Sequence, residues 1–194
     1  MPSKHDVTKA SILTAGLKMF LRRGFAGAGL TEILRTAKIP RGSFYHYFPG
    51  GKDEFVVAVI EAYVEHATAS RRSILGDPSQ PATKRLRRHF DAMADDFAAQ
   101  SFVRGCLLGN LAGEAADEFP DVKAALVEGF RVWADDLEAV LEEASKDVSL
   151  PASPAVTARM LVAGWEGAVL LMKSEGNVDA LSEFVDLWFG VLLA

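Results

Sequence analysis

One stretch of the sequence, residues 30–54, constrains the fold more than any other: LTEILRTAKIPRGSFYHYFPGGKDE. Its first part has apolar residues at helical spacing, which predicts a helix over residues 30–37: Leu30, Ile33, Leu34 and Ala37. Pro40 then interrupts the helix, because proline has no backbone N–H and disfavours helical backbone at the residue before it. A second helix is predicted to begin near Arg41, with Pro40 at or just before its first position.

The second predicted helix has two different sides. Phe44 and Phe48 are four residues apart and share one side, where we expect them to be core residues. The remaining surface carries basic, hydroxyl and aromatic side chains: Arg41, Ser43, Tyr45, His46 and Tyr47. Two short helices separated by about three to four residues, the second basic and aromatic, are the pattern of a helix-turn-helix that places its second helix in the DNA major groove.

The charge distribution also favours an interaction with nucleic acid, although the net charge of the whole chain is −5. Residues 1–52 contain nine Lys and Arg residues and two acidic residues, so this part carries +7, whereas residues 53–194 carry −12. Such an asymmetry is typical of a chain with one nucleic-acid-binding end. The acidic remainder discourages DNA from binding to the wrong face.

The rest of the pattern predicts an all-α fold of about nine helices. Glycine is expected to end the first helix at Gly24 and to cap the second at Gly29. Within the helix expected over residues 83–100, a solvated, basic face is predicted from four residues: Arg85, Arg87, Arg88 and His89. Helices are expected over residues 6–23, 30–37, from 41, 53–75, 83–100, within 105–116, 120–144, 155–175 and 178–193.

From Lys9 to Phe55, about a quarter of the chain, the sequence resembles the amino-terminal DNA-binding domain of the TetR family of bacterial transcriptional regulators. The most specific matching piece runs from Gly42 to Phe48 and is followed by Lys52, with one residue more before Lys52 than family members usually have. The resemblance implies a helix-turn-helix domain over residues 1–52 and a helical regulatory domain, for ligand binding and dimerisation, over residues 53–194. The other matching pieces are Ala15-Gly16-Leu17 through Phe20, Gly24-Phe25, and Leu30-Thr31-Glu32-Ile33-Leu34.

The resemblance also implies roles for residues in DNA binding. The candidates for reading base edges, or for lying near them, are Arg41, Gly42, Ser43 and His46. The candidates for contacts with the DNA backbone are Thr31, Tyr45, Tyr47 and Lys52. For Tyr45, packing in the core of the small domain is the alternative. A dimer would place two recognition helices about one DNA turn or more apart, which implies a near-palindromic operator.

The last two predicted helices favour a homodimer. Apolar residues go nearly all round the helix over residues 178–193, so it must be buried on more than one side. The helix before it contains Gly164, Gly167 and Ala168, which are small enough for a close helix crossing. A symmetric dimer through a four-helix bundle would cover both helices, and the TetR resemblance implies the same arrangement.

The family resemblance implies a pocket for a small-molecule effector, walled by apolar and aromatic side chains of the carboxy-terminal helices. For each candidate, plain core packing is the alternative. The candidates are Phe90, Met93, Phe97, Phe102, Cys106, Leu107, Asn110, Phe130, Trp133, Trp165 and Met172.

Cys106 raises a second possibility for the signal. The segment from Arg104 to Glu114 resembles a subgroup of TetR regulators that includes the N-ethylmaleimide-reductase repressor and the acrylate-responsive regulator. In the former, a cysteine at the matching place senses reactive electrophiles, which implies that Cys106 is a thiol sensor. Arg104 would favour the thiolate if the fold brings it close. The alternative is that Cys106 is a small buried hydrophobic residue.

Other function classes lack support in the sequence. The four histidines lack metal-ligand spacing, and nothing resembles a nucleophile elbow or an HExxH motif, so we expect no enzyme, no metal and no cofactor. A single cysteine excludes an internal disulfide framework. We find no apolar signal region, and apolar runs near Met160–Met172 look too short to span a bilayer, so we expect a cytoplasmic protein. A non-catalytic helical scaffold protein is the alternative to a repressor released from DNA by a small molecule or electrophile.

Overall fold

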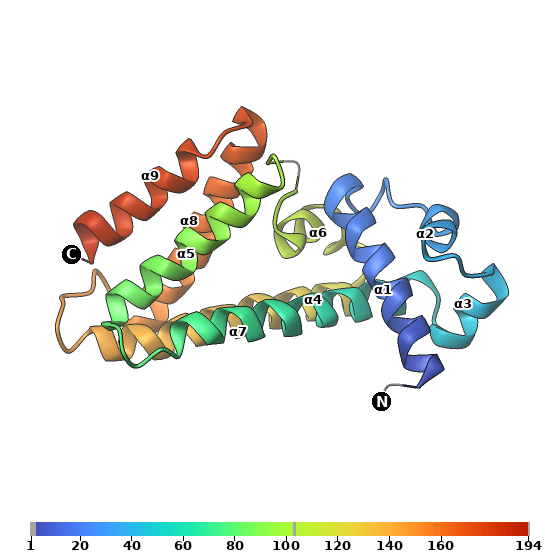
Figure 1. Ribbon diagram of the computed structural model, residues 1–194, viewed down its shortest axis with the longest axis horizontal. Helices are drawn as coiled ribbons and strands as arrows, with labels where there is room; N and C mark the ends of the chain where they lie inside the picture. Colours follow the sequence, from blue (N-terminus) through green and yellow to red (C-terminus); the bar gives the residue numbers. More distant parts are fainter. Residues whose placement is uncertain (1–2, 103, 194) are drawn as a thin grey trace. The chain divides into compact units, whose positions relative to one another are not determined.

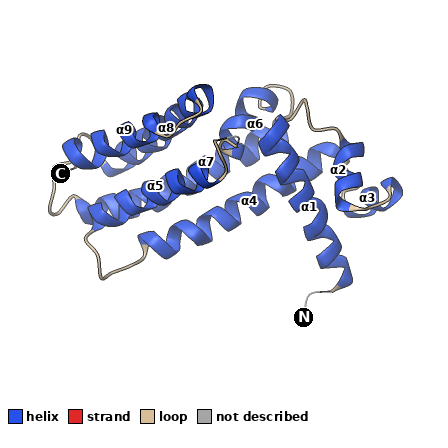
Figure 2. Cartoon of the chain, turned by 45° about the horizontal axis from the view of Figure 1, so that its top comes forward, coloured by secondary structure: helices blue, strands red, loops and turns tan. Residues whose placement is uncertain are grey.

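The computed structural model describes residues 3–102 and 104–193, which form helices and no strand, so the predicted all-α class is confirmed (Figures 1 and 2). Several predicted boundaries agree with the observed ones to within one or two residues. The helices are α1 (Lys4–Arg23), α2 (Leu30–Ala37), α3 (Arg41–Tyr47), α4 (Lys52–Leu75), α5 (Ala82–Ala99), α6 (Leu107–Ala115), α7 (Pro120–Ala144), α8 (Pro154–Glu175), α9 (Asp179–Leu187) and a short π-helix η1 (Trp188–Leu192).

The chain forms two compact units. Unit 1 consists of Met1–Glu65 and Cys106–Gly129, and unit 2 consists of His66–Gly105 and Phe130–Ala194. Unit 1 therefore holds α1 to α3, α6 and the first parts of α4 and α7, and unit 2 holds α5, α8, α9 and the remaining parts of α4 and α7. These units are compact parts of the fold and need not coincide with functional domains. The predicted boundary between a DNA-binding and a regulatory domain after residue 52 stays a prediction.

Local signals explain where the first helices begin and end. Ser3 caps α1 by accepting a hydrogen bond from the Asp6 N–H, and the Asp6 carboxylate accepts one from the Ser3 N–H. This capping box starts the helix two residues before the predicted start. At the other end Gly24 adopts φ +67°, a left-handed conformation that glycine reaches at little cost. Gly29 and Pro40 occupy the N-cap positions of α2 and α3, as predicted.

An aromatic core fixes α3 in unit 1. Phe44 and Phe48, both at most 1% exposed, confirm the expected core side of the helix. Their rings lie 5.5 and 5.1 Å from the ring of Phe55 in α4, and Phe20 of α1 lies 6.0 Å from the same ring. A Cβ atom on Gly16 would lie 2.3 Å from the Phe55 ring, so α1 and α4 approach closely only because residue 16 has no side chain.

The core of unit 2 is contributed by α5, α7, α8 and α9. Trp165 of α8 is fully buried, and its ring lies 5.1 Å from Phe90 of α5 and 5.4 Å from Phe184 of α9. Figures 1 and 2 show α9 running along α8 and α5. The sequence predicts one regular helix that continues to residue 193. It instead ends with a π turn, in which the Leu193 N–H donates to the carbonyl of Trp188 five residues earlier.

Helix α8 begins one residue before the predicted start and is both long and apolar. Over 22 residues its most apolar window has a mean hydropathy of 1.4, which by length and composition would suffice to cross a membrane. The expectation that this segment is too short was therefore wrong. In the structure 44% of that window is buried, and core helices of soluble proteins have the same length and composition.

The expected solvated basic face of α5 is wrong for two of its four residues. Arg85 and His89 are 5% and 4% exposed, because their spacing of four places them beside Leu86 and Phe90 on the apolar side. The Arg85 guanidinium donates from Nη1 to the Leu75 carbonyl at 2.6 Å, and its Nη2 lies 2.5 Å from a carboxylate oxygen of Glu143. The other two arginines of the predicted face do lie nearer the surface, where Arg87 pairs with Asp91 and Asp186 and Arg88 with Asp77.

A buried ion pair joins α4 to α7 within unit 2. Arg71 donates to the Asp136 carboxylate from Nε at 2.8 Å and from Nη2 at 2.6 Å, and both side chains are less than a tenth exposed. Arg72 donates to the other carboxylate oxygen at 2.8 Å, and Thr68 accepts a further bond from Arg71 at 3.0 Å. Removing one partner from such a pair leaves a buried charge uncompensated.

We therefore expect Asp136→Asn to lower the free energy of unfolding by about 3 to 5 kcal/mol, measured by urea denaturation. The neighbouring Asp135 supplies a matched control, because it pairs with Arg131 in solvent, where both side chains are about half exposed. Asp135→Asn should cost less than about 1 kcal/mol. Equal losses in the two variants would contradict a special role for the buried pair.

Candidate nucleic-acid interface and effector core

The turn between α2 and α3 sets the orientation of the second helix. Lys38 adopts a left-handed conformation with φ 59°, and the next residue, Ile39, donates from its N–H to the Leu34 carbonyl at 2.9 Å. Pro40 then gives the N-cap carbonyl that accepts from the Ser43 N–H at 3.0 Å. The break predicted from Pro40 is thus a tight, hydrogen-bonded turn.

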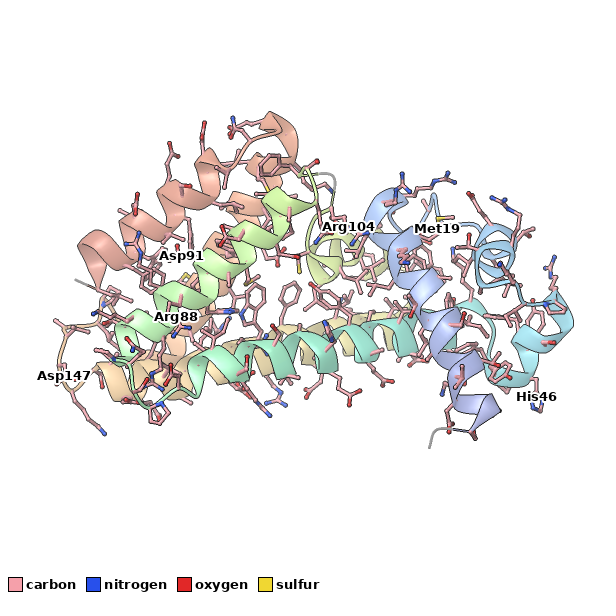
Figure 3. All side chains as sticks on the ribbon, viewed as in Figure 1. Met19, His46, Arg88, Asp91, Arg104 and Asp147 are labelled. Carbon is pink, nitrogen blue, oxygen red and sulfur yellow. The ribbon has the colours of Figure 1, made fainter. Side chains whose placement is uncertain are left out.

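The face of α3 opposite Phe44 is open to solvent. Tyr45 is 45% exposed, so its alternative of core packing is wrong, although its ring edge contacts Phe44 at 5.3 Å. Figure 3 shows the His46 side chain pointing away from the rest of unit 1. The predicted base-reading candidates are brought together on this face: Arg41, Gly42 and His46 are exposed and Ser43 is half-buried. Tyr47 is half-buried on the same helix, and Thr31 is exposed in the first turn of α2.

The amino-terminal turn of α1 adds a residue that the sequence reading missed. The ring of His5 lies 4.6 Å from the ring of Tyr47 and 6.2 Å from that of His46, so it borders the exposed face of α3. Residues 5 and 46 are distant in sequence, and nothing in the pattern of α1 alone indicates this contact.

Lys52 is half-buried, and its ammonium group is held against the Phe25 loop. Its Nζ donates to the Phe25 carbonyl at 3.2 Å and lies 3.9 Å from the centre of the Phe25 ring. Burial lowers the pKa of Lys52, with Asp53 and Glu114 acting in the opposite direction. The predicted contact of Lys52 with the DNA backbone stays a prediction.

Acidic side chains fix the loop and the helix ends beside this face. Glu32 of α2 pairs with Arg23 at 2.5 Å and with Arg35 at 3.8 Å, so it links the end of α1 to α2. Glu114 of α6 accepts a hydrogen bond from the Ala26 N–H at 3.0 Å. A Cβ atom on Gly24 would lie 1.9 Å from the same carboxylate, so only glycine allows this approach.

The predicted effector residues are divided between the two units. Cys106, Leu107 and Asn110 belong to unit 1, and all the other candidates belong to unit 2. In unit 2, Phe90, Phe97, Trp133, Trp165 and Met172 lie in one buried apolar cluster, against which Met93, Phe102 and Phe130 pack. Whether any of them contacts a ligand stays a prediction.

Cys106 is the N-cap residue of α6 and is 4% exposed. Its Sγ lies 3.8 Å from the hydroxyl oxygen of Tyr63. Cys106 belongs to unit 1 and Arg104 to unit 2, so the expected influence of Arg104 on the thiol stays a prediction.

His89 lies in the aromatic core of unit 2, where the sequence reading expected a solvated face. Its ring is 4.9 Å from Phe90 and meets Trp133 edge-on at 6.4 Å. Burial lowers the pKa of His89 to about 3, and the nearby Arg71 cation acts in the same direction while Asp136 opposes it. His89 is therefore neutral at pH 7.

Comparison with known proteins identifies the family. Residues 12–59 match the family described as "Bacterial regulatory proteins, tetR family", and residues 82–188 match "Tetracyclin repressor-like, C-terminal domain". The second match alone spans more than half of the chain. The chain belongs to the TetR family of bacterial transcriptional regulators. It is therefore a DNA-binding regulator, and its exposed α3 is the second helix of the family's helix-turn-helix.

Several known transcriptional regulators are similar to this chain over most of its length. The transcriptional regulator AcuR of Cereibacter sphaeroides is 36% identical over 90% of this chain and 80% of its own. The repressor DhaR of Mycobacterium sp. is 30% identical over 94% of this chain and 90% of its own. The repressor NemR of Escherichia coli is 31% identical over 92% of this chain and 90% of its own.

Solved structures give the same result. A TetR regulatory protein from Rhodobacter sphaeroides has a TM-score of 0.86 at 34% identity, over 95% of this chain and 97% of its own. E. coli NemR in its reduced form also has a TM-score of 0.86, at 29% identity over 92% and 93%. Because the relatives are named regulators or repressors, the TetR-family chain is not an enzyme, as expected, and the scaffold alternative is set aside.

The neutral, buried His89 predicts a dependence of this regulator's stability on pH. Between pH 6.5 and about 3 the unfolded chain binds a proton at His89 that the folded chain does not. The free energy of unfolding should therefore fall with falling pH, by up to about 1.4 kcal/mol per unit from this residue. His89→Leu removes this contribution, so denaturation at pH 7, 6 and 5 should give it a flatter profile than the parent. Parallel profiles would contradict a buried neutral histidine.

Proposed function

We propose that this TetR-family regulator is a homodimeric repressor that binds a near-palindromic operator through α3 and leaves it when a small molecule or an electrophile binds. The observation that carries the DNA-binding part is the exposed polar face of α3, held on a rigid aromatic core. Repression is supported by the names of DhaR and NemR, which are described as repressors. A cytoplasmic location follows from action on the chromosome of a bacterial cell.

In the proposed complex α3 lies in the major groove. Arg41, Gly42, Ser43 and His46 are the residues at or near base edges, since side chains near the start of a recognition helix reach the bases. Contacts from Thr31, Tyr45, Tyr47 and Lys52 would go to the DNA backbone and fix the register.

His46→Ala tests the assignment of base reading. With DNA flanking the protein's own gene, we expect weaker binding to the selected operator by about 1 to 3 kcal/mol and little change on unrelated DNA. Thr31→Val should instead weaken binding to both DNAs alike, because a phosphate contact carries no sequence information. Fluorescence anisotropy at two salt concentrations measures both. His66→Ala, an exposed histidine outside the helix-turn-helix, is the control. Equal losses on both DNAs for His46→Ala would contradict base reading.

The proposed dimer uses α8 and α9. Large apolar side chains that unit 2 leaves exposed recur along one side of α8, namely Val156, Met160, Leu170 and Leu171, and Leu187 of α9 is also exposed. Between them, Ala163, Gly164 and Gly167 are exposed and small enough for a second helix to approach. Exposed apolar stripes of this kind mark protein interfaces, and a twofold four-helix bundle would cover the stripe.

Leu170→Glu tests this interface, since it would bury a charge in the dimer without disturbing the core of one protomer. We expect a monomer by sedimentation velocity and at least tenfold weaker operator binding, because one recognition helix reads only a half-site. Val127→Glu is the matched control, as Val127 in α7 of unit 1 is 61% exposed and Leu170 is 62% exposed. A dimer that persists in Leu170→Glu would refute the assignment.

Helix α6 gives a route from a signal to the DNA-binding helices within unit 1. Its N-cap residue is Cys106, and near its other end Glu114 accepts the hydrogen bond from Ala26 in the loop before α2. In the same loop the Phe25 ring lies 5.0 Å from Phe119, which follows α6. We propose that a displacement of α6 moves this loop and with it α2 and α3. Such a shift releases DNA only if the signal binds the displaced conformer more tightly.

Cys106 is proposed as the electrophile sensor, with a purely structural core residue as the alternative. Its burial favours the alternative, because reactive cysteines are usually partly exposed. Its place at the start of α6 favours the sensor, because a bulky adduct there would have to displace the helix. Cys106→Ser should abolish release from DNA by N-ethylmaleimide and leave basal DNA binding intact, measured by anisotropy. An unchanged response to the electrophile would refute the sensor role.

A further inference from the structure

Among the residues that the structure describes, five buried side-chain nitrogen atoms of unit 2 have no hydrogen-bond partner. Two of them, Nε and Nη2, belong to Arg85, whose Nη2 lies 2.5 Å from the Glu143 carboxylate. The other three belong to aromatic side chains. They are Nε2 of His89 in α5, Nε1 of Trp133 in α7 and Nε1 of Trp165 in α8. The three residues are 4%, 5% and 0% exposed, so bulk water does not reach them. An indole N–H can only donate, and leaving a buried donor unpaired costs about 1 to 3 kcal/mol. Nearly all buried polar groups in native proteins have a partner, so these three require an explanation.

The three side chains belong to one aromatic cluster. The His89 ring meets the Trp133 ring at 6.4 Å, and Phe90, the next residue along α5, lies 5.1 Å from the Trp165 ring. Around Trp165 the other neighbouring rings are Phe97 and Phe184, at 6.4 and 5.4 Å. A water molecule needs about two to four polar partners, and the phenylalanine rings that pack around Trp165 offer none. A ligand with an apolar body and a few acceptor atoms fits these surroundings better.

The charges in this core are already compensated. The buried cations that the structure describes, Arg71 and Arg85, each hold a carboxylate, from Asp136 and Glu143 respectively. His89 is neutral, because burial keeps its pKa far below 7. An anionic ligand would therefore bury its charge without an unpaired cation to receive it, which is strongly unfavourable.

We propose that the effector of this regulator is an uncharged molecule whose carbonyl or ether oxygen atoms accept hydrogen bonds from the indole N–H groups of Trp133 and Trp165 and from the Nε2–H of neutral His89. The inference rests on the proposed function, because it assumes that a small molecule regulates DNA binding. Beyond that function, the inference identifies the chemical class of the effector from the buried polar atoms of unit 2. The indole donors set the acceptor requirement, and the paired arginines set the preference for a neutral ligand.

The first test compares neutral and anionic partners of the same shape on the parent protein at pH 7. Isothermal titration calorimetry would use cyclohexanone against cyclohexanecarboxylate and benzaldehyde against benzoate, with toluene as a probe that has no acceptor. We expect both carbonyl compounds to bind at least tenfold more tightly than the matching carboxylate, and benzaldehyde more tightly than toluene. Carboxylates that bind as well as the carbonyl compounds, or an absence of binding in both classes, would overturn the proposal.

The second test removes the donors and keeps the rings. Trp133→Phe and Trp165→Phe should each weaken binding of the carbonyl compounds by about tenfold, the effect of one lost hydrogen bond. The melting temperature of each free variant is measured as well, because the smaller phenylalanine ring leaves a cavity, and only a variant that stays folded tests the loss of the donor. Trp188→Phe is the control, since Trp188 is half-buried and its N–H is not among the unpartnered atoms.

Failure of this proposal can be distinguished from failure of the proposed function. Operator binding is measured on each free variant without any probe, and it should equal that of the parent. If operator binding persists while both tryptophan variants keep full affinity for the carbonyl compounds, the chemical assignment is wrong and the regulator assignment stands. If operator binding is absent in the parent protein, the proposed function fails whatever the calorimetry gives.

Discussion

The packing of Phe44 and Phe48 against Phe55 is the interaction on which the DNA-binding face depends. Helix α3 has only seven residues, and a helix of that length has no independent stability in water. Its direction is therefore set by the two phenylalanines that it buries against α4, with rings at 5.5 and 5.1 Å from Phe55. Because the core takes every large apolar residue of α3, its remaining surface is free for polar contacts with DNA.

Hydrogen bonds within unit 1 link the loop before α2 to other parts of the unit. The loop before α2 is held from two sides, by Glu114 through the Ala26 N–H and by Lys52 through the Phe25 carbonyl. In the proposed switch, a displacement of α6 would change the geometry of this loop, because the hydrogen bond from the Ala26 N–H ends on Glu114 of α6. The fixed turn at Lys38 and Pro40 then passes that change on to α3.

Sequence patterns predicted the elements well and the polar interior badly, for different physical reasons. The helix 30–37, the break at Pro40 and the helix 120–144 rest on local periodicity and on local breakers, which neighbouring residues decide. Burial of Arg85 depends on Leu75 and Glu143, and burial of His89 depends on Trp133, all distant in sequence. Likewise, the contact of His5 with Tyr47 and the pairing of Lys52 arise only when α1, α3 and the Phe25 loop come together.

The unpaired donors of unit 2 give a physical reason for a switch. If the Trp133 and Trp165 N–H groups had no partner in any state, the folded protein would be destabilised and nothing would compensate the loss of free energy. An effector that accepts hydrogen bonds from these N–H groups gains binding free energy only in a conformer in which the groups can reach it. It gains none in a conformer in which the tryptophans repack. A ligand shifts an equilibrium only by its differential affinity for the two states. Two or three hydrogen bonds made in one state alone correspond to about 1 kcal/mol each, which is in the range of measured coupling energies between sites.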